Sequence, residues 1–153
     1  LISFISVAQS KDCKYKTKYD EFEKTTRYSV ENKFLTASLS SLGYSVYAFK
    51  KNDTFLGAFI MFSVNGTGGC TASNSYVSFM FDDNEVKEYK YTGEIDCGTH
   101  NITIDLQKAD LELLASKKVT KIRVCFDYPK DYDVSENKIV KFAESLKCIL
   151  SEF

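Results

Sequence analysis

Hydrophobic and polar residues alternate along most of the first half of the chain, and this period of two is typical of β-strands. The pattern predicts strands over residues 26–32, 34–40, 44–50 and 55–64, with turns at SSLG (40–43) and KKND (50–53). In YSVYAFK and in residues 55–64 both alternating sets are apolar, as in strands that are covered on both sides. We therefore expect something to pack on each face of at least one sheet.

The clearest hairpin is YVSFMFDDNEVKEYKY (76–91), in which two strand-like runs flank a turn of Asp, Asn and Glu residues. Asp and Asn suit such a turn because their side chains hydrogen-bond to their own backbone. The second run mixes apolar and charged residues, which is typical of an edge strand. Two further strands are predicted at NITIDL (101–106), with its apolar residues on one face, and at VTKIRVCF (119–126).

Two segments have a helical period instead. DLELLASK predicts a short helix near residues 108–117, and SENKIVKFAESLKCILSEF predicts an amphipathic helix near residues 135–150 with Ser135 as its N-cap. Strands followed by a strand-helix-strand-helix order predict a mainly β fold. We expect an antiparallel two-layer β-sandwich with two helices, the second packed on a sheet face or closing an open end.

The first ten residues, LISFISVAQS, carry no charge and are similar to the trailing part of a secretory signal peptide. Ala8 and Ser10 occupy the positions that small residues take at a signal-peptide cleavage site. The alternative interpretation of this segment is an edge strand with Ile2 and Phe4 on one face. We expect residues 1–10 to be a residual signal segment and residues 11–153 to be a single domain. The protein is then periplasmic or secreted.

Charge and composition limit the classes of partner that the protein can bind. The chain of 153 residues has 20 basic and 21 acidic side chains, so it lacks the positive charge that nucleic acid or an anionic membrane attracts. Its longest apolar run after the opening, residues 55–64, is too short to span a membrane. We expect the partner to be another protein or a glycan, with no nucleic acid, no membrane insertion and no cofactor.

Five cysteines in an exported chain predict disulfide bonds, and the odd number leaves at least one thiol over. Cys70 and Cys97 both lie in glycine-bearing segments, so we favour that pair, although the spacing leaves the connectivity open. Cys13 and Cys148 could join the two ends of the chain. Cys125 lies inside a strand pattern and is predicted to be a buried free thiol.

Aromatic, thiol and carboxylate groups supply the candidate sites. Tyr89, Tyr91, Tyr128 and Tyr132 could form a contact patch for a partner, although cross-strand packing explains most aromatic residues in sheets.

Cys97 and His100 are residues of the kinds that act as a catalytic nucleophile and its general base, but the sequence shows no third group that would orient the histidine. The carboxylates of Asp127, Asp131 and Asp133 could bind calcium, although the segment lacks the glycine and the closing Glu of an EF-hand loop and also suits a solvated turn.

The succession of DEFEKTT, the strands, SFMFDDNEVKEY, DLELLASKKVTKIRVCFD and the terminal helix resembles small uncharacterised exported β-rich proteins of Gram-negative bacteria. The resemblance implies a sandwich fold and a location outside the cytoplasm, and it brings no functional residues. We expect a non-enzymatic binding or interaction module. The alternatives are an exported inhibitor or immunity-like protein that blocks a partner enzyme through a loop such as 65–75, and a thiol-dependent enzyme that uses Cys97 and His100.

Overall fold

The computed structural model describes residues 14–36, 41–66 and 68–153. The strands are β1 (Lys16–Asp20), β2 (Thr25–Phe34), β3 (Leu42–Lys51), β4 (Thr54–Val64), β5 (Gly69–Thr71), β6 (Tyr76–Phe81), β7 (Val86–Lys90), β8 (Asp96–Thr99), β9 (Asn101–Leu106), β10 (Val119–Cys125) and β11 (Pro129–Asp133). The helices are α1 (Lys108–Ser116) and α2 (Glu136–Leu150).

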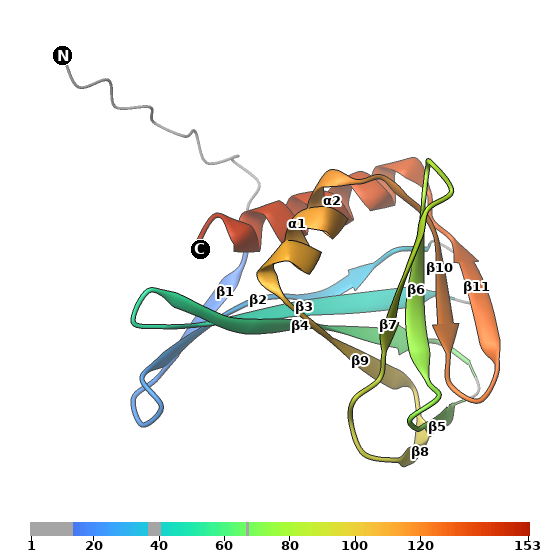
Figure 1. Ribbon diagram of the computed structural model, residues 1–153, viewed down its shortest axis with the longest axis horizontal. Coiled ribbons are helices and arrows are strands. Elements are labelled where there is room, and N and C mark those ends of the chain that lie inside the picture. Colours follow the sequence, from blue (N-terminus) through green and yellow to red (C-terminus); the bar gives the residue numbers. More distant parts are fainter. Residues whose placement is uncertain (1–13, 37–40, 67) are drawn as a thin grey trace.

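The strands form three antiparallel sheets with the orders β1-β2-β3-β4-β9, β11-β10-β6-β7 and β5-β8. Figure 1 shows both helices on the same face of the five-stranded sheet, with the four-stranded sheet standing at one end of it. The prediction of a mainly β, antiparallel, sandwich-like fold with two helices is confirmed. Neither helix in the described part of the chain is long and apolar enough to cross a membrane.

The inner face of the five-stranded sheet is built from rows of apolar side chains that run across the strands. Val30, Val46, Ile60 and Ile104 are successive cross-strand partners, and each is at most 4% exposed. Strict alternation within each strand produces this face, because neighbouring side chains point to opposite sides of a sheet.

Helix α2 completes the core where the two large sheets meet. Its buried side chains are Ile139, Phe142, Leu146, Cys148 and Ile149. The Phe142 ring lies edge-on to Tyr44 of the five-stranded sheet, at 5.0 Å between centroids, and 6.4 Å from Phe79 of the four-stranded sheet. Phe79 in turn lies 5.9 Å from Phe62. One aromatic cluster therefore joins the helix and both sheets.

The C-terminal residue anchors the end of the chain to the five-stranded sheet. The Phe153 ring packs edge-on against Tyr28 and Phe55, at 5.5 and 5.0 Å between centroids. Next to it, the Tyr15 hydroxyl donates a hydrogen bond to the Glu152 carboxylate. The segment before β1 and the end of the chain are thus held together.

Several boundaries differ from the prediction. The predicted turn at 40–43 is wrong from Leu42 onward, because Leu42 and Gly43 are buried and pair with β4. Phe34 ends β2 and does not begin a new strand, and residues 37–40 lie outside the described residues. Strands β1, β5, β8 and β11 were not predicted. The signal segment, residues 1–10, also lies outside the described residues and stays a prediction.

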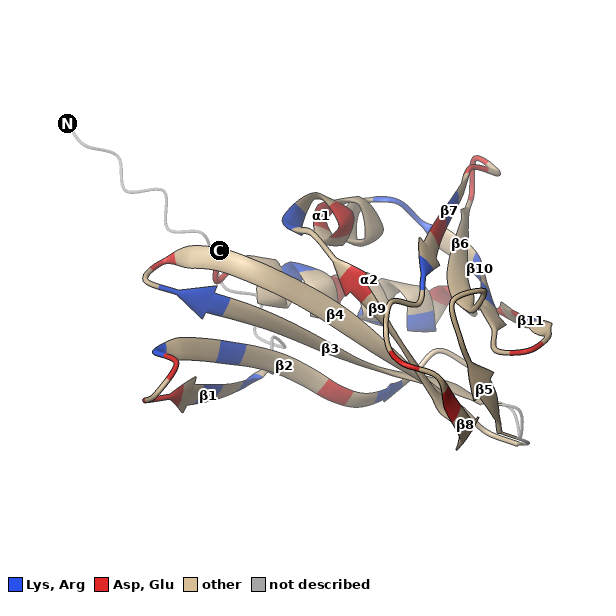
Figure 2. Cartoon of the chain, turned by 60° about the horizontal axis from the view of Figure 1, so that its bottom comes forward, with Lys and Arg blue, Asp and Glu red and all other residues tan. Residues whose placement is uncertain are grey.

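In the described part of the chain, no second layer packs on the outer face of the five-stranded sheet, although the apolar pattern of its strands led us to expect cover on both faces. Figure 2 brings forward the face of the five-stranded sheet that is turned away from the helices, and no described helix or strand crosses in front of β2, β3 and β4. Tyr47, Phe59 and Met61 lie on this outer face and are half-buried. Contacts among neighbouring side chains, and no further layer, cover them.

Truncation of Phe142, the ring at the centre of the aromatic cluster, should lower the stability of the fold strongly. Phe142→Ala removes a fully buried side chain at the junction of three layers, so we expect the free energy of unfolding to fall by about 3–5 kcal/mol. Val140→Ala, on the same helix but 54% exposed, is the matched control and should change it by less than about 0.5 kcal/mol. Equal effects of the two substitutions in urea denaturation would contradict this core.

The contact between Tyr15 and Glu152 predicts a pH dependence. The hydrogen bond to the carboxylate raises the pKa of Tyr15 to about 12 from 10.0. Stability from this contact is present below pH 10, where the unfolded tyrosine also keeps its proton, and is lost as the pH rises toward 12. Tyr15→Phe should therefore lose less stability over that interval, and its ultraviolet titration should lack one late-ionising tyrosine. If Tyr15→Phe instead removes a tyrosine that ionises near the ordinary pKa of 10.0, the contact with Glu152 does not form.

Candidate functional site

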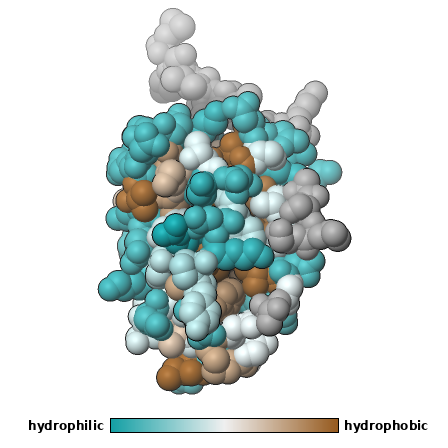
Figure 3. All heavy atoms as spheres, turned by 90° about the vertical axis from the view of Figure 1, so that its right-hand side faces the viewer, coloured by the Kyte–Doolittle hydropathy of each residue, from teal (hydrophilic) through white to brown (hydrophobic). Residues whose placement is uncertain are grey.

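A cleft of about 790 Å³ lies between the loop that follows β4 and the β10–β11 hairpin. Its lining residues are Val64, Asn65, Gly66, Gly68, Gly69, Val124, Phe126, Asp127, Tyr128, Pro129, Lys130 and Tyr132. Figure 3 views the end of the molecule that carries these elements, where small hydrophobic areas are set among hydrophilic ones. Such a mixture of apolar walls and a few polar groups is typical of ligand-binding clefts.

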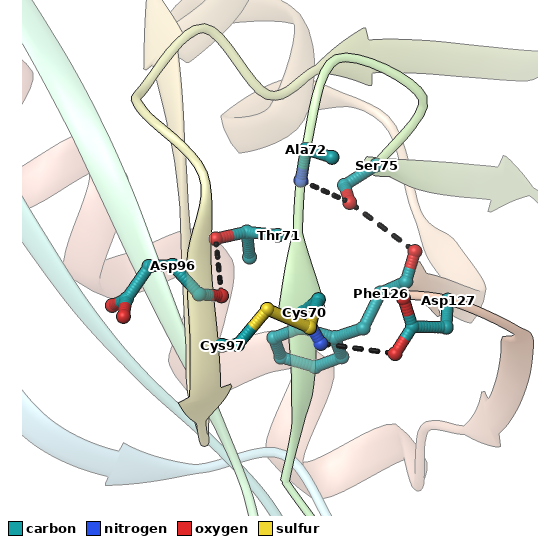
Figure 4. Close-up of a disulfide and its surroundings, with 8 residues drawn as sticks. All are labelled: Cys70, Thr71, Ala72, Ser75, Asp96, Cys97, Phe126 and Asp127. Carbon is teal, nitrogen blue, oxygen red and sulfur yellow. Dashed lines mark hydrogen bonds between the residues drawn. A yellow bond between two sulfur atoms is a disulfide. The ribbon is translucent and has the colours of Figure 1, made fainter.

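A disulfide bond fixes one wall of the cleft. Cys70 on β5 and Cys97 on β8 are cross-strand partners, and their sulfur atoms are bonded at 2.04 Å (Figure 4). The pairing favoured from the sequence is therefore present. The Thr71 hydroxyl adds a hydrogen bond of 3.3 Å to the carbonyl of Asp96 across the same ribbon.

Asp127 joins this wall to the opposite one. Its carboxylate accepts a hydrogen bond of 3.0 Å from the backbone N–H of Cys70 (Figure 4). Nearby, the Ser75 hydroxyl accepts from the N–H of Ala72 at 3.0 Å and donates to the carbonyl of Phe126 at 3.2 Å. The disulfide ribbon and the start of the β10–β11 hairpin are thus held by polar contacts as one unit.

Two glycines allow close approach of the chain segments at this corner. A Cβ atom at Gly69 would lie 2.8 Å from Cβ of Phe126, and one at Gly68 would lie 2.9 Å from the carbonyl oxygen of Thr99. Both distances are shorter than van der Waals contact allows, so a side chain at Gly69 would push the two walls apart, and one at Gly68 would push apart the two strands of the disulfide ribbon.

The four predicted tyrosines do not form one patch. Tyr128 is 85% exposed at the rim of the cleft, whereas Tyr132, also in the lining, is only 5% exposed. Burial raises the pKa of Tyr132, and the Lys130 ammonium lies 5.2 Å from its ring centroid. Tyr128 lies in the bend before β11, whereas Tyr132 is buried within that strand, so Tyr128 is the one of this pair with a ring that a partner can reach.

Tyr89, which was considered for the contact patch, is 8% exposed and belongs to the core. Its hydroxyl donates to the Asp110 carboxylate at 3.1 Å, and burial, with the nearby charge of Asp110, raises its pKa. Tyr91 packs against the core, and its hydroxyl donates to the carbonyl of Glu94 at 2.9 Å. These two tyrosines have structural contacts and do not line the cleft.

The carboxylates considered for calcium point to different partners. Asp131 accepts two hydrogen bonds from the Arg123 guanidinium, at 2.6 and 2.9 Å, which lower the pKa of Asp131. Asp133 lies 3.6 Å from the Lys121 ammonium, and Asp127 is bonded to Cys70. Among the described residues, no group of three or more acidic, His or Cys side chains could hold a metal ion. Asp127 lies in the exposed bend between β10 and β11, in keeping with the solvated turn considered as the alternative, whereas Asp131 and Asp133 lie on strand β11.

The disulfide also determines what Cys97 can do. A sulfur atom bonded to another sulfur has no thiolate for nucleophilic attack, so Cys97 and His100 do not form a nucleophile–base pair in this oxidised state. His100 instead lies at the turn between β8 and β9, where its carbonyl accepts a hydrogen bond of 2.8 Å from Val64.

Of the remaining cysteines, Cys125 is the predicted buried free thiol, at 7% exposure. Burial raises the pKa of its thiol, so less of it is in the reactive thiolate form. Cys148 is disulfide-bonded and buried in α2. Cys13 lies outside the described residues, so its pairing with Cys148 stays a prediction.

Sequence reasoning missed the residues that hold the cleft together. Ser75 and Phe126 were not singled out, and Asp127 was considered only as a metal ligand. The one local signal was the Gly68-Gly69 pair directly before Cys70, which is typical of close backbone approach.

Comparisons of the chain with protein-family models, with curated proteins and with solved structures gave no match. The resemblance to exported β-rich proteins therefore stays a prediction, and any assignment of function depends on the geometry above.

Removal of the disulfide should weaken the whole fold. The bond closes a loop with a sequence separation of 27, for which chain entropy gives about 3–4 kcal/mol. We expect Cys70→Ala with Cys97→Ala to lower the free energy of unfolding by that amount. Cys125→Ala, which removes a thiol and no bond, is the control and should cost less than half as much. An unchanged unfolding midpoint in the double variant would contradict the role of this bond.

Proposed function

We propose that this protein is an exported, non-enzymatic binding protein that holds an extended segment of a partner protein in the cleft between the β4–β5 loop and the β10–β11 hairpin. The observation that carries this proposal is the fixed position of both walls. The Cys70–Cys97 bond and the Asp127 hydrogen bond hold them before any partner arrives. A preorganised site binds more tightly because less conformational freedom is lost on binding.

Tyr128 supports the cleft as the binding site. Tyrosine is enriched among the residues that dominate binding energy, and the ring of Tyr128 stands 85% exposed at the rim. The lining also offers Asp127 and Lys130, which suit hydrogen bonds to a peptide backbone or to side chains of either charge.

A protein partner fits better than a glycan. Sugars stack on open aromatic faces, and in the cleft only Tyr128 offers a well-exposed ring, since Tyr132 is buried. The balanced charge of the chain likewise offers no attraction for nucleic acid.

Export is supported by the disulfide chemistry. Disulfide bonds persist in oxidising compartments such as the periplasm or the exterior, and are rare in the cytosol. Cys70, Cys97 and Cys148 are all disulfide-bonded in the described part of the chain.

The inhibitor alternative requires loop 65–75 to protrude into a partner enzyme. Within this loop Thr71 is 1% exposed and Ser75 is fully buried, and both hydrogen-bond inward. Such a loop is suited to form a wall that receives a partner, and less suited to be an inserted element.

The test is peptide selection against the immobilised, oxidised chain, using a randomised peptide library, followed by calorimetric titration of the selected peptides. We expect Tyr128→Ala to weaken binding at least about tenfold, because it removes the accessible ring. Tyr19→Ala is the matched control, since Tyr19 is 56% exposed on β1, and it should bind as the unsubstituted chain does. Failure to select any peptide, or equal binding by the Tyr128 variant, would overturn the proposal.

A further inference from the structure

The outer face of the five-stranded sheet carries an aromatic centre that no described element covers. The rings of Tyr47 and Phe59 stack at 4.7 Å between centroids with an angle of 27° between planes, and Phe49 lies 5.8 Å from Phe59. The Arg27 guanidinium lies 5.6 Å from the centroid of Tyr47. Helices and the four-stranded sheet are all on the other side, as Figures 1 and 2 show.

The orientation of these rings selects the kind of surface that can cover them. Because Tyr47 and Phe59 stack against one another, their faces are turned inward and their edges outward. A sugar ring needs an open aromatic face, whereas another protein surface packs well against ring edges. Met61, beside them on β4, adds a flexible apolar side chain.

Charge is distributed unequally across this face. The strand register places Lys16, Ser29, Tyr47, Phe59 and Asp105 in one continuous row from β1 to β9. The row begins with a cation, has two aromatic rings near its middle and ends with an anion. When two copies of this row face each other in opposite directions, each cation meets an anion and the aromatic rings meet each other.

We propose that the outer face of the five-stranded sheet is the interface of a homodimer, with a second copy of this chain packed on it about a two-fold axis along β3. This operation puts Lys16 of each copy opposite Asp105 of the other, and Tyr47 opposite its own equivalent. The Lys16 ammonium pairs with Glu31 of its own sheet at 2.9 Å, and because its side chain is 75% exposed it can also reach across to the other copy.

The neighbouring row supports the same symmetry. Arg27, Phe49 and Gly57 are successive partners on β2, β3 and β4, so the axis places Arg27 of one copy opposite Gly57 of the other. A Cβ atom at Gly57 would meet nothing within 4 Å, so there is open space for a long side chain. Two sheets that face each other in this way pack about 10 Å apart, with their side chains interleaved.

The test is sedimentation equilibrium of the oxidised chain from low to several hundred micromolar. We expect a monomer–dimer equilibrium that Phe59→Lys shifts to monomer at every concentration, because a charge would be buried in the aromatic centre. Val86→Lys is the matched control, since Val86 is 54% exposed on the other sheet, and its dimer should equal that of the unsubstituted chain. A monomer throughout, or a dimer that survives Phe59→Lys, would overturn the proposal.

A charge exchange tests the symmetry itself. Asp105→Lys places two cations opposite each other and should weaken the dimer at least tenfold, and Lys16→Asp together with Asp105→Lys should restore it. Both variants lose the Thr92–Asp105 hydrogen bond equally, and Lys16→Asp alone is the control for loss of the Lys16–Glu31 ion pair within one copy, so recovery reports the contact between copies. A double variant as weak as the single one would overturn this arrangement. Because Tyr128 and the cleft are not on this face, the dimer and peptide binding can fail independently.

Discussion

The bond between Cys70 and Cys97 holds the corner at which the chain passes from the five-stranded sheet to the four-stranded sheet. The β5–β8 ribbon continues the pairing of β4 with β9, and the hydrogen bond from Val64 to His100 links the two ladders. Strand β6 of the second sheet follows directly after this ribbon. The same corner forms one wall of the cleft and, through Asp127, fixes the other. The position of the candidate site therefore depends on this one covalent constraint.

The aromatic core determines how helix α2 and the two large sheets pack against one another. Phe142 of α2 and Phe79 of the four-stranded sheet meet the inner face of the five-stranded sheet, so the helix fills the space between the sheets at the side away from the disulfide corner. This packing uses only one face of the five-stranded sheet and leaves the aromatic centre around Tyr47 on the other. The fold thus keeps the cleft and the proposed dimer face apart, and a partner and a second copy could bind together.

Local patterns in the sequence predicted those elements that form because of their own turn residues and apolar periodicity. The hairpin at 76–91 and both helices follow from turn residues and apolar periodicity, and the glycine-bearing context favoured Cys70 with Cys97. Strands KTKYD and PKDYD have no apolar alternation, so they could not be recognised. They are strands because they pair with β2 and β10, and ion pairs such as Lys16–Glu31 and Arg123–Asp131 accompany that pairing. The role of Asp127 was equally hidden, because its partner Cys70 is 57 residues away in the chain.

Amide hydrogen exchange of the oxidised chain, with and without Asp127→Asn, tests most directly whether the two walls of the cleft form one unit. An Asn side chain loses the charge that strengthens the bond to the N–H of Cys70. We expect residues 69–75 and 125–130 to lose protection together, while the α2 amides stay protected. Faster exchange in 125–130 alone, with unchanged protection of the Cys70 amide, would show that the two walls of the cleft are independent.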